Sequence, residues 1–240
     1  MRPSDDRGTT RNGWLDARHS FSFGQYLDAR HMGFGPLRAL NENRLAPATS
    51  FPMREHANME ILSIVVDGTI EHRDSAGAIA LLRPGAAHLL SAGTGTRRRI
   101  GNASGVQPLH FLQLWIVPER DDLAPRSEVL GAVALDADTP LRLIAAGTGT
   151  GTGAGTGTGE VRVLALHRDV RVFMGSLRAG RCLRHAIAPL RGVWVQVIAG
   201  ALTTGPHRVD AGDGFSLTDA EEMSLHALAD TQFLLVELQP

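Results

Sequence analysis

The sequence contains no lysine, so all 24 of its basic residues are arginine, set against 25 acidic residues and a formal net charge of −1. A chain this close to neutrality has no general electrostatic attraction for nucleic acid or for a membrane surface. We therefore expect neither as a partner. A GC-rich genome is the simplest explanation for arginine throughout, so a single arginine is not by itself evidence for a site.

Cysteine is nearly absent as well. The one thiol, Cys182, excludes an intrachain disulfide and favours a reducing compartment. Residues 1–10 are polar and lack the apolar segment of a secretion signal, and no apolar run reaches the roughly 20 residues of a membrane helix. We expect a cytoplasmic protein in which Cys182 is a small buried hydrophobe. A redox-responsive thiol beside Arg181 and Arg184 is the alternative.

Helix-period patterns are scarce, and short β-branched or apolar runs end instead in glycine-containing turns. Strands at this spacing predict a sandwich or barrel. Apolar runs without strict alternation indicate strands that are covered on both faces. The predicted strands are 59–66, 69–73, 78–82, 86–90 and 110–117 in the first half, and 193–198, 201–204 and 215–218 in the second.

The two halves share one order of predicted strands and turn residues: strand, glycine, strand, turn, strand, glycine, strand. This order indicates an internal duplication of one β unit. The unit is typical of a cupin, a small double-stranded β-barrel of the jelly-roll type. The sequence thus predicts an all-β bicupin with domains at 1–130 and 131–240.

A Gly/Thr-rich segment at 147–159 interrupts the second half. It has almost no side chain to bury and cannot offset the entropy of its own ordering. Because the flanking segments 141–146 and 161–166 both have strand composition, we predict a hairpin tip here. No GK[ST] motif follows the glycines, so a phosphate-binding loop is not expected.

A series of longer motifs, in order from about residue 14 to the C-terminus, resembles the pirin family of bicupins. The resemblance implies two facing barrels, with a metal pocket in the first formed by a His-x-His pair and a later His-x-Glu pair. Some members are described as quercetin 2,3-dioxygenases and others as regulators of transcription or enzyme partners. The motifs are HSFSF at 19–23, HMGFG at 31–35, MEI at 59–61, EHRDS at 71–75, RPG at 83–85, SAGTG at 91–95, HFLQLWI at 110–116, WVQV at 194–197 and AGDG at 211–214.

At the family's four ligand positions this chain has Arg54, His56, Arg98 and Ile100. Only His56 matches. A guanidinium has no lone pair to give and repels a divalent cation, and an isoleucine offers no donor. The sequence therefore predicts that the metal site is degenerate and that no cofactor is bound. The alternative is one Fe, Mn, Ni or Cu ion in the N-terminal cupin.

The altered pocket has two interpretations. Arg54 and Arg98 can bind an anion, since arginine forks match carboxylate and phosphate. Alternatively, the arginines pair internally with acidic neighbours and fill the space that the metal left. The residues expected beside the pocket are Glu55, Glu60, Arg97 and Arg99, with Glu71 as a further pairing candidate, and His72, His88 and His110 are expected to be hydrogen-bonded structural residues.

Three functions stay open at this point. The first is a metal-free module that binds an anionic small molecule or a protein. The second is a metal-dependent dioxygenase of the quercetinase type, and the third is a regulatory protein that works through its surface. The chain is expected to be a monomer or a weak homodimer.

Overall fold

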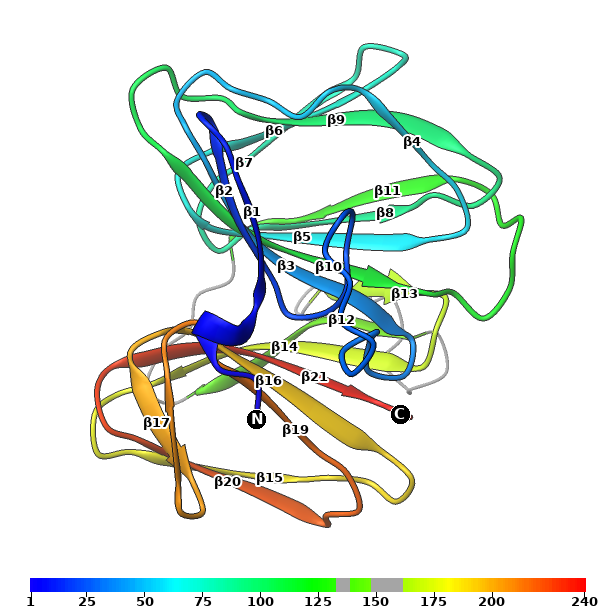
Figure 1. Cartoon of the computed structure of the whole chain (residues 1–240). Helices are drawn as coiled ribbons and strands as arrows, with labels where there is room; N and C mark the ends of the chain where they lie inside the picture. Colours follow the sequence, from blue (N-terminus) through cyan, green and yellow to red (C-terminus); the bar gives the residue numbers. More distant parts are fainter. Residues whose placement is uncertain (133–138, 148–161) are drawn as a thin grey trace.

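The computed structural model describes residues 1–132, 139–147 and 162–240. It is built almost wholly of strands, which form four sheets stacked as layers (Figure 1). The described residues contain one short 3₁₀ turn, η1 (Ser4–Asp6), and no helix that is long and apolar enough to cross a membrane. The predicted all-β bicupin is therefore confirmed.

Each half contributes one large and one small sheet, and the two large sheets form the middle layers (Figure 1). In the first half the large sheet has the order β1 (Gly8–Arg11), β2 (Leu15–His19), β3 (Leu37–Leu45), β10 (Leu109–Ile116), β5 (Glu60–Asp67), β8 (Ala87–Ser91) and β11 (Arg126–Leu130). Its small sheet has the order β4 (Arg54–His56), β9 (Thr96–Asn102), β6 (Ile70–Asp74) and β7 (Ile79–Leu82).

The second half repeats this arrangement. Its large sheet has the order β13 (Leu164–Leu166), β12 (Leu141–Gly147), β14 (Val170–Leu177), β21 (Thr231–Leu238), β16 (Gly192–Ala199) and β19 (Gly214–Leu217). Its small sheet has the order β15 (Cys182–Ala186), β20 (Glu222–Ala227), β17 (Ala201–Thr204) and β18 (His207–Asp210).

The middle layers explain the continuous apolar runs. One face of β5 and β10 packs against the second half through Leu62, Ile64, Leu112 and Leu114, in the largest apolar cluster of the molecule. The other face of the same sheet closes the first barrel, where Phe111 lies in a separate cluster. Strands covered on both faces need few polar residues, and this is the pattern that the sequence showed.

The hairpin tip predicted at 147–159 lies almost wholly outside the described residues. Gly147 is its one described residue, but the strands on either side of it are described. β12 and β13 pair in parallel, with Ala145 opposite Leu164. A tight turn joins only antiparallel strands, and a parallel pair needs a crossover connection. β12 and β13 are therefore not the two arms of a hairpin.

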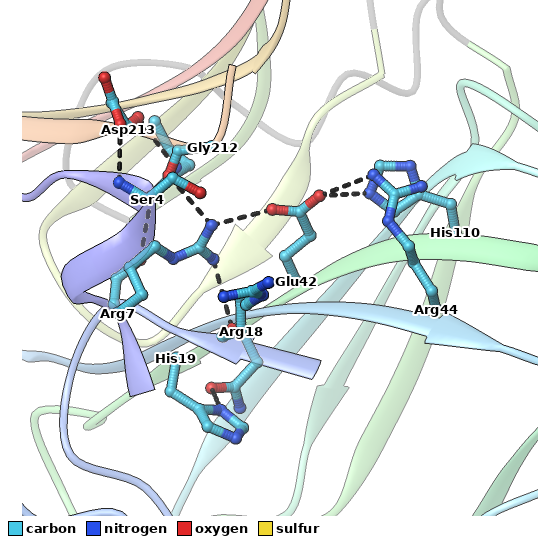
Figure 2. Close-up of polar contacts among 12 residues, drawn as sticks. Ser4, Arg7, Arg18, His19, Glu42, Arg44, His110, Gly212 and Asp213 are labelled. Atoms are coloured by element: carbon cyan, nitrogen blue, oxygen red, sulfur yellow. Dashed lines mark hydrogen bonds and ion pairs between the residues drawn. The ribbon is translucent and has the colours of Figure 1, made fainter. Parts of the chain in front are cut away.

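Buried polar contacts join the N-terminal segment and the first large sheet to the second half (Figure 2). Arg7, which is 3% exposed, donates from Nη1 to Glu42 Oε2 (2.9 Å) and to the carbonyl of Gly212 (3.0 Å). Glu42 Oε1 also lies 2.9 Å from His110 Nε2. The carboxylate of Asp213 accepts from the backbone N–H of Ser4 at 2.7 Å. The two halves are thus joined by hydrogen bonds as well as by apolar packing.

Candidate functional site

The four positions that the resemblance assigns to metal ligands come from two paired strands of the small sheet. β4 pairs with β9 so that Arg54 lies opposite Arg98 and His56 lies opposite Thr96. Ile100 follows two residues after Arg98, and side chains two apart on a strand share a face. The structure therefore places all four positions around one cavity.

This cavity, which we call the barrel cavity, has a volume of about 380 Å³. It opens between the small sheet, strands β2, β3 and β10, and the loop after β2. Two arginines and two histidines line it, and none of the lining residues is Asp or Glu. The lining residues are Thr10, Leu15, Ala17, His19, Phe23, Gly24, Gln25, Asn41, Asn43, Phe51, Pro52, Arg54, His56, Arg98, Ile100, Gln113 and Trp115.

A row of polar side chains crosses the large sheet beneath the cavity, one from each of five neighbouring strands. In register they are His19, Asn41, Gln113, Ser63 and His88. All five are buried. The sequence prediction missed this row except for His88, because its members lie far apart in the chain and interrupt otherwise apolar strands.

Hydrogen bonds hold the row in place. Asn41 Oδ1 lies 2.7 Å from His19 Nδ1; since an amide oxygen only accepts, that nitrogen carries the proton. The indole N–H of Trp115 donates to Gln113 Oε1 at 2.8 Å. Both amide oxygens are therefore occupied, and their NH₂ groups remain as donors.

Arg98 extends from the small sheet into the barrel towards this row. Its side chain is buried, and Nη1 donates to His88 Nε2 at 2.6 Å. Ser127 Oγ lies 2.9 Å from the same nitrogen. Burial lowers the pKa of Arg98, and the charge of Asp74 opposes this effect. Guanidinium nevertheless stays protonated at neutral pH, so the barrel contains a buried cation.

Two stacked histidines surround the Arg98 guanidinium. The ring centroids of His72 and His88 lie 4.0 Å apart. Burial, followed by the charge of Arg98, lowers the pKa of His88 to about 3. Burial also lowers the pKa of His72 well below its usual range. Both rings are therefore neutral at pH 7, and neither competes with Arg98 for an anion.

His72 differs from expectation. We expected a hydrogen-bonded structural residue, but both of its ring nitrogens are buried without a partner among the described residues. Together with His88, Arg98 and Gln113 it lines an inner chamber of about 20 Å³ that adjoins the barrel cavity. A space of this size holds about one water molecule. His110 is hydrogen-bonded as expected, with Nε2 2.9 Å from Glu42 Oε1.

Of the internal pairings considered for the pocket arginines, Arg99 pairs with Glu71, whereas among the described residues Arg98 has no ion pair with Glu55, Glu60 or Glu71. Buried Glu60 accepts instead from Ser91 Oγ (2.7 Å) and from the backbone and ring N–H groups of His167, which belongs to the second half. Glu71 pairs with Arg99 and with Arg73, each at 3.2 Å.

The other predicted neighbours of the pocket are exposed. Glu55 and Arg97 lie opposite each other across β4 and β9, on the exterior of the barrel. Arg54 lines the mouth of the cavity and is exposed. Cys182 is also exposed, which corrects the expected buried position; it begins β15 in the small sheet of the second half.

His56 is half-buried and packs edge-on against Trp115, with ring centroids 5.3 Å apart. Burial, followed by the charges of Arg54 and Arg98, lowers the pKa of His56. A neutral imidazole can bind a metal, but the other three positions do not support it. The described residues contain no group of three His, Cys, Asp or Glu side chains placed to hold a metal ion. The donor set present therefore does not fit the divalent metal of the family pocket.

Comparison with known proteins agrees with this architecture. The family described as Pirin matches residues 1–116, and the family described as Quercetinase C-terminal cupin domain matches residues 156–238. A quercetin 2,3-dioxygenase of Escherichia coli K12 is 34% identical over 240 residues, which is 100% of this chain and 98% of that protein. The chain belongs to the pirin family.

Pirin structures also superpose on this chain along its whole length. The crystal structure of YhhW from E. coli matches with a TM-score of 0.90 at 34% identity and covers 100% of this chain and 97% of its own. A crystal structure of the bacterial pirin YhhW in complex with nickel(II) matches with a TM-score of 0.89 at 33% identity, covering 100% and 98%. This pirin therefore shares its fold with a relative whose crystal structure is a complex with nickel(II).

Proposed function

We propose that this pirin has lost its metal site and that the barrel cavity binds an anionic small molecule. The observation that carries the proposal is Arg98: a buried guanidinium that faces a cavity without acidic lining residues, and that has no ion pair among the described residues, although the charge of Asp74 acts on it. A buried charge without a counter-charge is costly, and an anionic ligand supplies that counter-charge. Exposed Arg54 at the mouth adds a second positive charge on the path of entry.

Anion binding is expected to stabilise the folded protein. At a concentration about ten times its Kd, citrate or phosphate should raise the Tm by about 3–6 °C. Arg98→Met should abolish this rise, while Arg97→Met, which removes an exposed charge on the same strand, should leave it nearly intact. Differential scanning fluorimetry at constant ionic strength measures both. If the Tm of the parent protein does not rise, or if it rises equally in all three proteins, the proposal is contradicted.

The second candidate is a metal-dependent dioxygenase of the quercetinase type, favoured by the likeness to the E. coli quercetin 2,3-dioxygenase. In that case His56 would be the one retained family ligand. Elemental analysis after purification and dialysis against nickel, iron, manganese or copper separates the two candidates. A stoichiometric metal that is lost in His56→Ala would overturn the proposed loss of the metal site.

A further inference from the structure

The contacts of Arg98 leave one edge of its guanidinium free. Nη1 is occupied by His88, whereas Nε is buried and has no hydrogen-bond partner among the described residues. Nε and Nη2 carry two parallel N–H groups on one side of the guanidinium plane. Two parallel donors at this spacing match the two oxygens of a carboxylate. The free edge therefore selects for the shape of an anion as well as for its charge.

The wall beside Arg98 presents donors rather than acceptors. The oxygens of Gln113 and Asn41 accept from Trp115 and His19. Gln113 Nε2 donates to Ser63 Oγ at 3.4 Å, which leaves one N–H of Gln113 and the amide N–H groups of Asn41 as further donors. Arg98 is the one arginine of this cavity that is buried, while Arg54 lies at the solvent. One buried positive charge matches a ligand with one negative charge better than a doubly charged phosphate.

One part of the cavity wall is apolar and aromatic. Phe23 and Trp115 meet edge-on, with ring centroids 5.2 Å apart, and Phe51 and Ile100 also line the cavity. The hydrogen bond to Gln113 fixes the indole of Trp115. Rings held in this way favour a flat, rigid partner, because edge-to-face contacts depend on orientation. A volume of about 380 Å³ lies in the lower part of the range for small-molecule sites.

We infer that the ligand of the barrel cavity is an aromatic carboxylic acid. Its carboxylate binds the Nε and Nη2 edge of Arg98, and its ring packs against Phe23 and Trp115. This inference rests on the proposed anion-binding function and names the ligand class for that site. It involves no covalent step.

Four probes test the inference by isothermal titration calorimetry on the full chain. 2-Naphthoate combines ring and carboxylate, 2-naphthamide has the ring without the charge, acetate has the carboxylate without the ring, and inorganic phosphate is the competing anion. 2-Naphthoate should bind about 10- to 100-fold more tightly than each of the other three, since a charge-assisted contact and a buried ring each contribute.

Matched variants assign this selectivity to residues. Arg98→Met should weaken 2-naphthoate about 10- to 100-fold, and Arg97→Met should not change it. Arg98→Lys keeps the charge without the two-donor edge, so it should also weaken the binding of 2-naphthoate about tenfold. This variant replaces Arg98→Met in the test if the methionine variant does not fold. Phe23→Leu should weaken 2-naphthoate about fivefold and leave phosphate binding unchanged.

The outcomes distinguish the inference from the proposal beneath it. Equal affinities for 2-naphthoate and 2-naphthamide would overturn the role of the carboxylate. Binding of phosphate that depends on Arg98, without binding of 2-naphthoate, would overturn the ligand class and retain anion binding. If neither anion binds in a manner that depends on Arg98, the inference and the proposed function both fail.

Discussion

Replacing Arg7 by methionine is expected to lower the free energy of unfolding by about 3–5 kcal/mol. The guanidinium of Arg7 is buried between Glu42 and the carbonyl of Gly212 (Figure 2). Its loss leaves the buried Glu42 carboxylate with fewer partners and the carbonyl of Gly212 with Gln196 as its remaining donor. Methionine keeps most of the apolar volume, so the change reports on the ion pair. Urea unfolding followed by tryptophan fluorescence measures it.

The pKa values of both partners are lowered, which disfavours the charged form of Arg7 and favours the charged form of Glu42. Burial lowers the pKa of Arg7 in spite of Glu42. Burial alone raises the pKa of Glu42, but the hydrogen bond from His110 and the charge of Arg7 outweigh it and lower the pKa to about 2. Glu42 accepts from three donors, Arg7, Arg44 and His110. Because Arg7 and Glu42 are both charged at neutral pH, their contact is an ion pair under the conditions of the experiment.

Arg11→Met is the matched control for this prediction. Arg11 lies on β1, close to Arg7 in the chain, and its ion pair with Asp16 is exposed. Exposed pairs contribute about 0–1 kcal/mol. A loss of less than about 1 kcal/mol in Arg7→Met, equal to that in Arg11→Met, would contradict the structural role given to Arg7.

Acid is expected to destabilise the protein well before its carboxylates are protonated. The pKa of His88 is lowered to about 3 in the folded state, compared with about 6.5 in the unfolded chain. The unfolded chain therefore binds the proton first, and stability falls as the pH drops below about 6.5. His88 alone should cost about 3 kcal/mol between pH 7 and pH 4, and His72 adds a loss of the same sign.

Urea unfolding at pH 7, 5.5 and 4 tests this slope. His88→Gln removes the titrating group while its amide oxygen can still accept from Arg98, so the variant should lose less stability on acidification than the parent. His207→Gln, which changes an exposed histidine on β18, is the control and should keep the parental slope. Equal slopes for all three proteins would show that His88 is not neutral in the folded barrel.

The fold could be predicted from apolar runs because the middle sheets are covered on both faces. The eight predicted strands correspond to β5–β8, β10, β16, β17 and β19, with ends within one residue or two of those observed. β3 was not predicted, because Asn41, Glu42 and Asn43 interrupt its apolar pattern. Asn41 and Asn43 line the barrel cavity, and Glu42 belongs to the network that joins the halves. These polar positions break the apolar run by which a buried strand is recognised in the sequence.

From the sequence, only the residue numbers of the candidate site could be predicted, and not the contacts that its side chains make. The placement of Arg54, His56, Arg98 and Ile100 around one cavity follows from the pairing of β4 with β9. The partner of Arg98 could not be predicted, because the choice between His88 and Glu60 depends on the second half. Glu60 is occupied by His167, which is 107 residues away in the chain. No local pattern contains that contact.

The polar row across five strands bears on how this site could change during evolution. Each strand contributes a single side chain to the row, and the opposite faces of β3, β10, β5 and β8 pack in the apolar cluster shared with the second half. A substitution at one position of the row therefore alters the chemistry of the cavity without altering strand register or the apolar layer behind it. Ligand selectivity in such a barrel can change in single steps, and a guanidinium can take the place of a metal ligand while the scaffold stays the same.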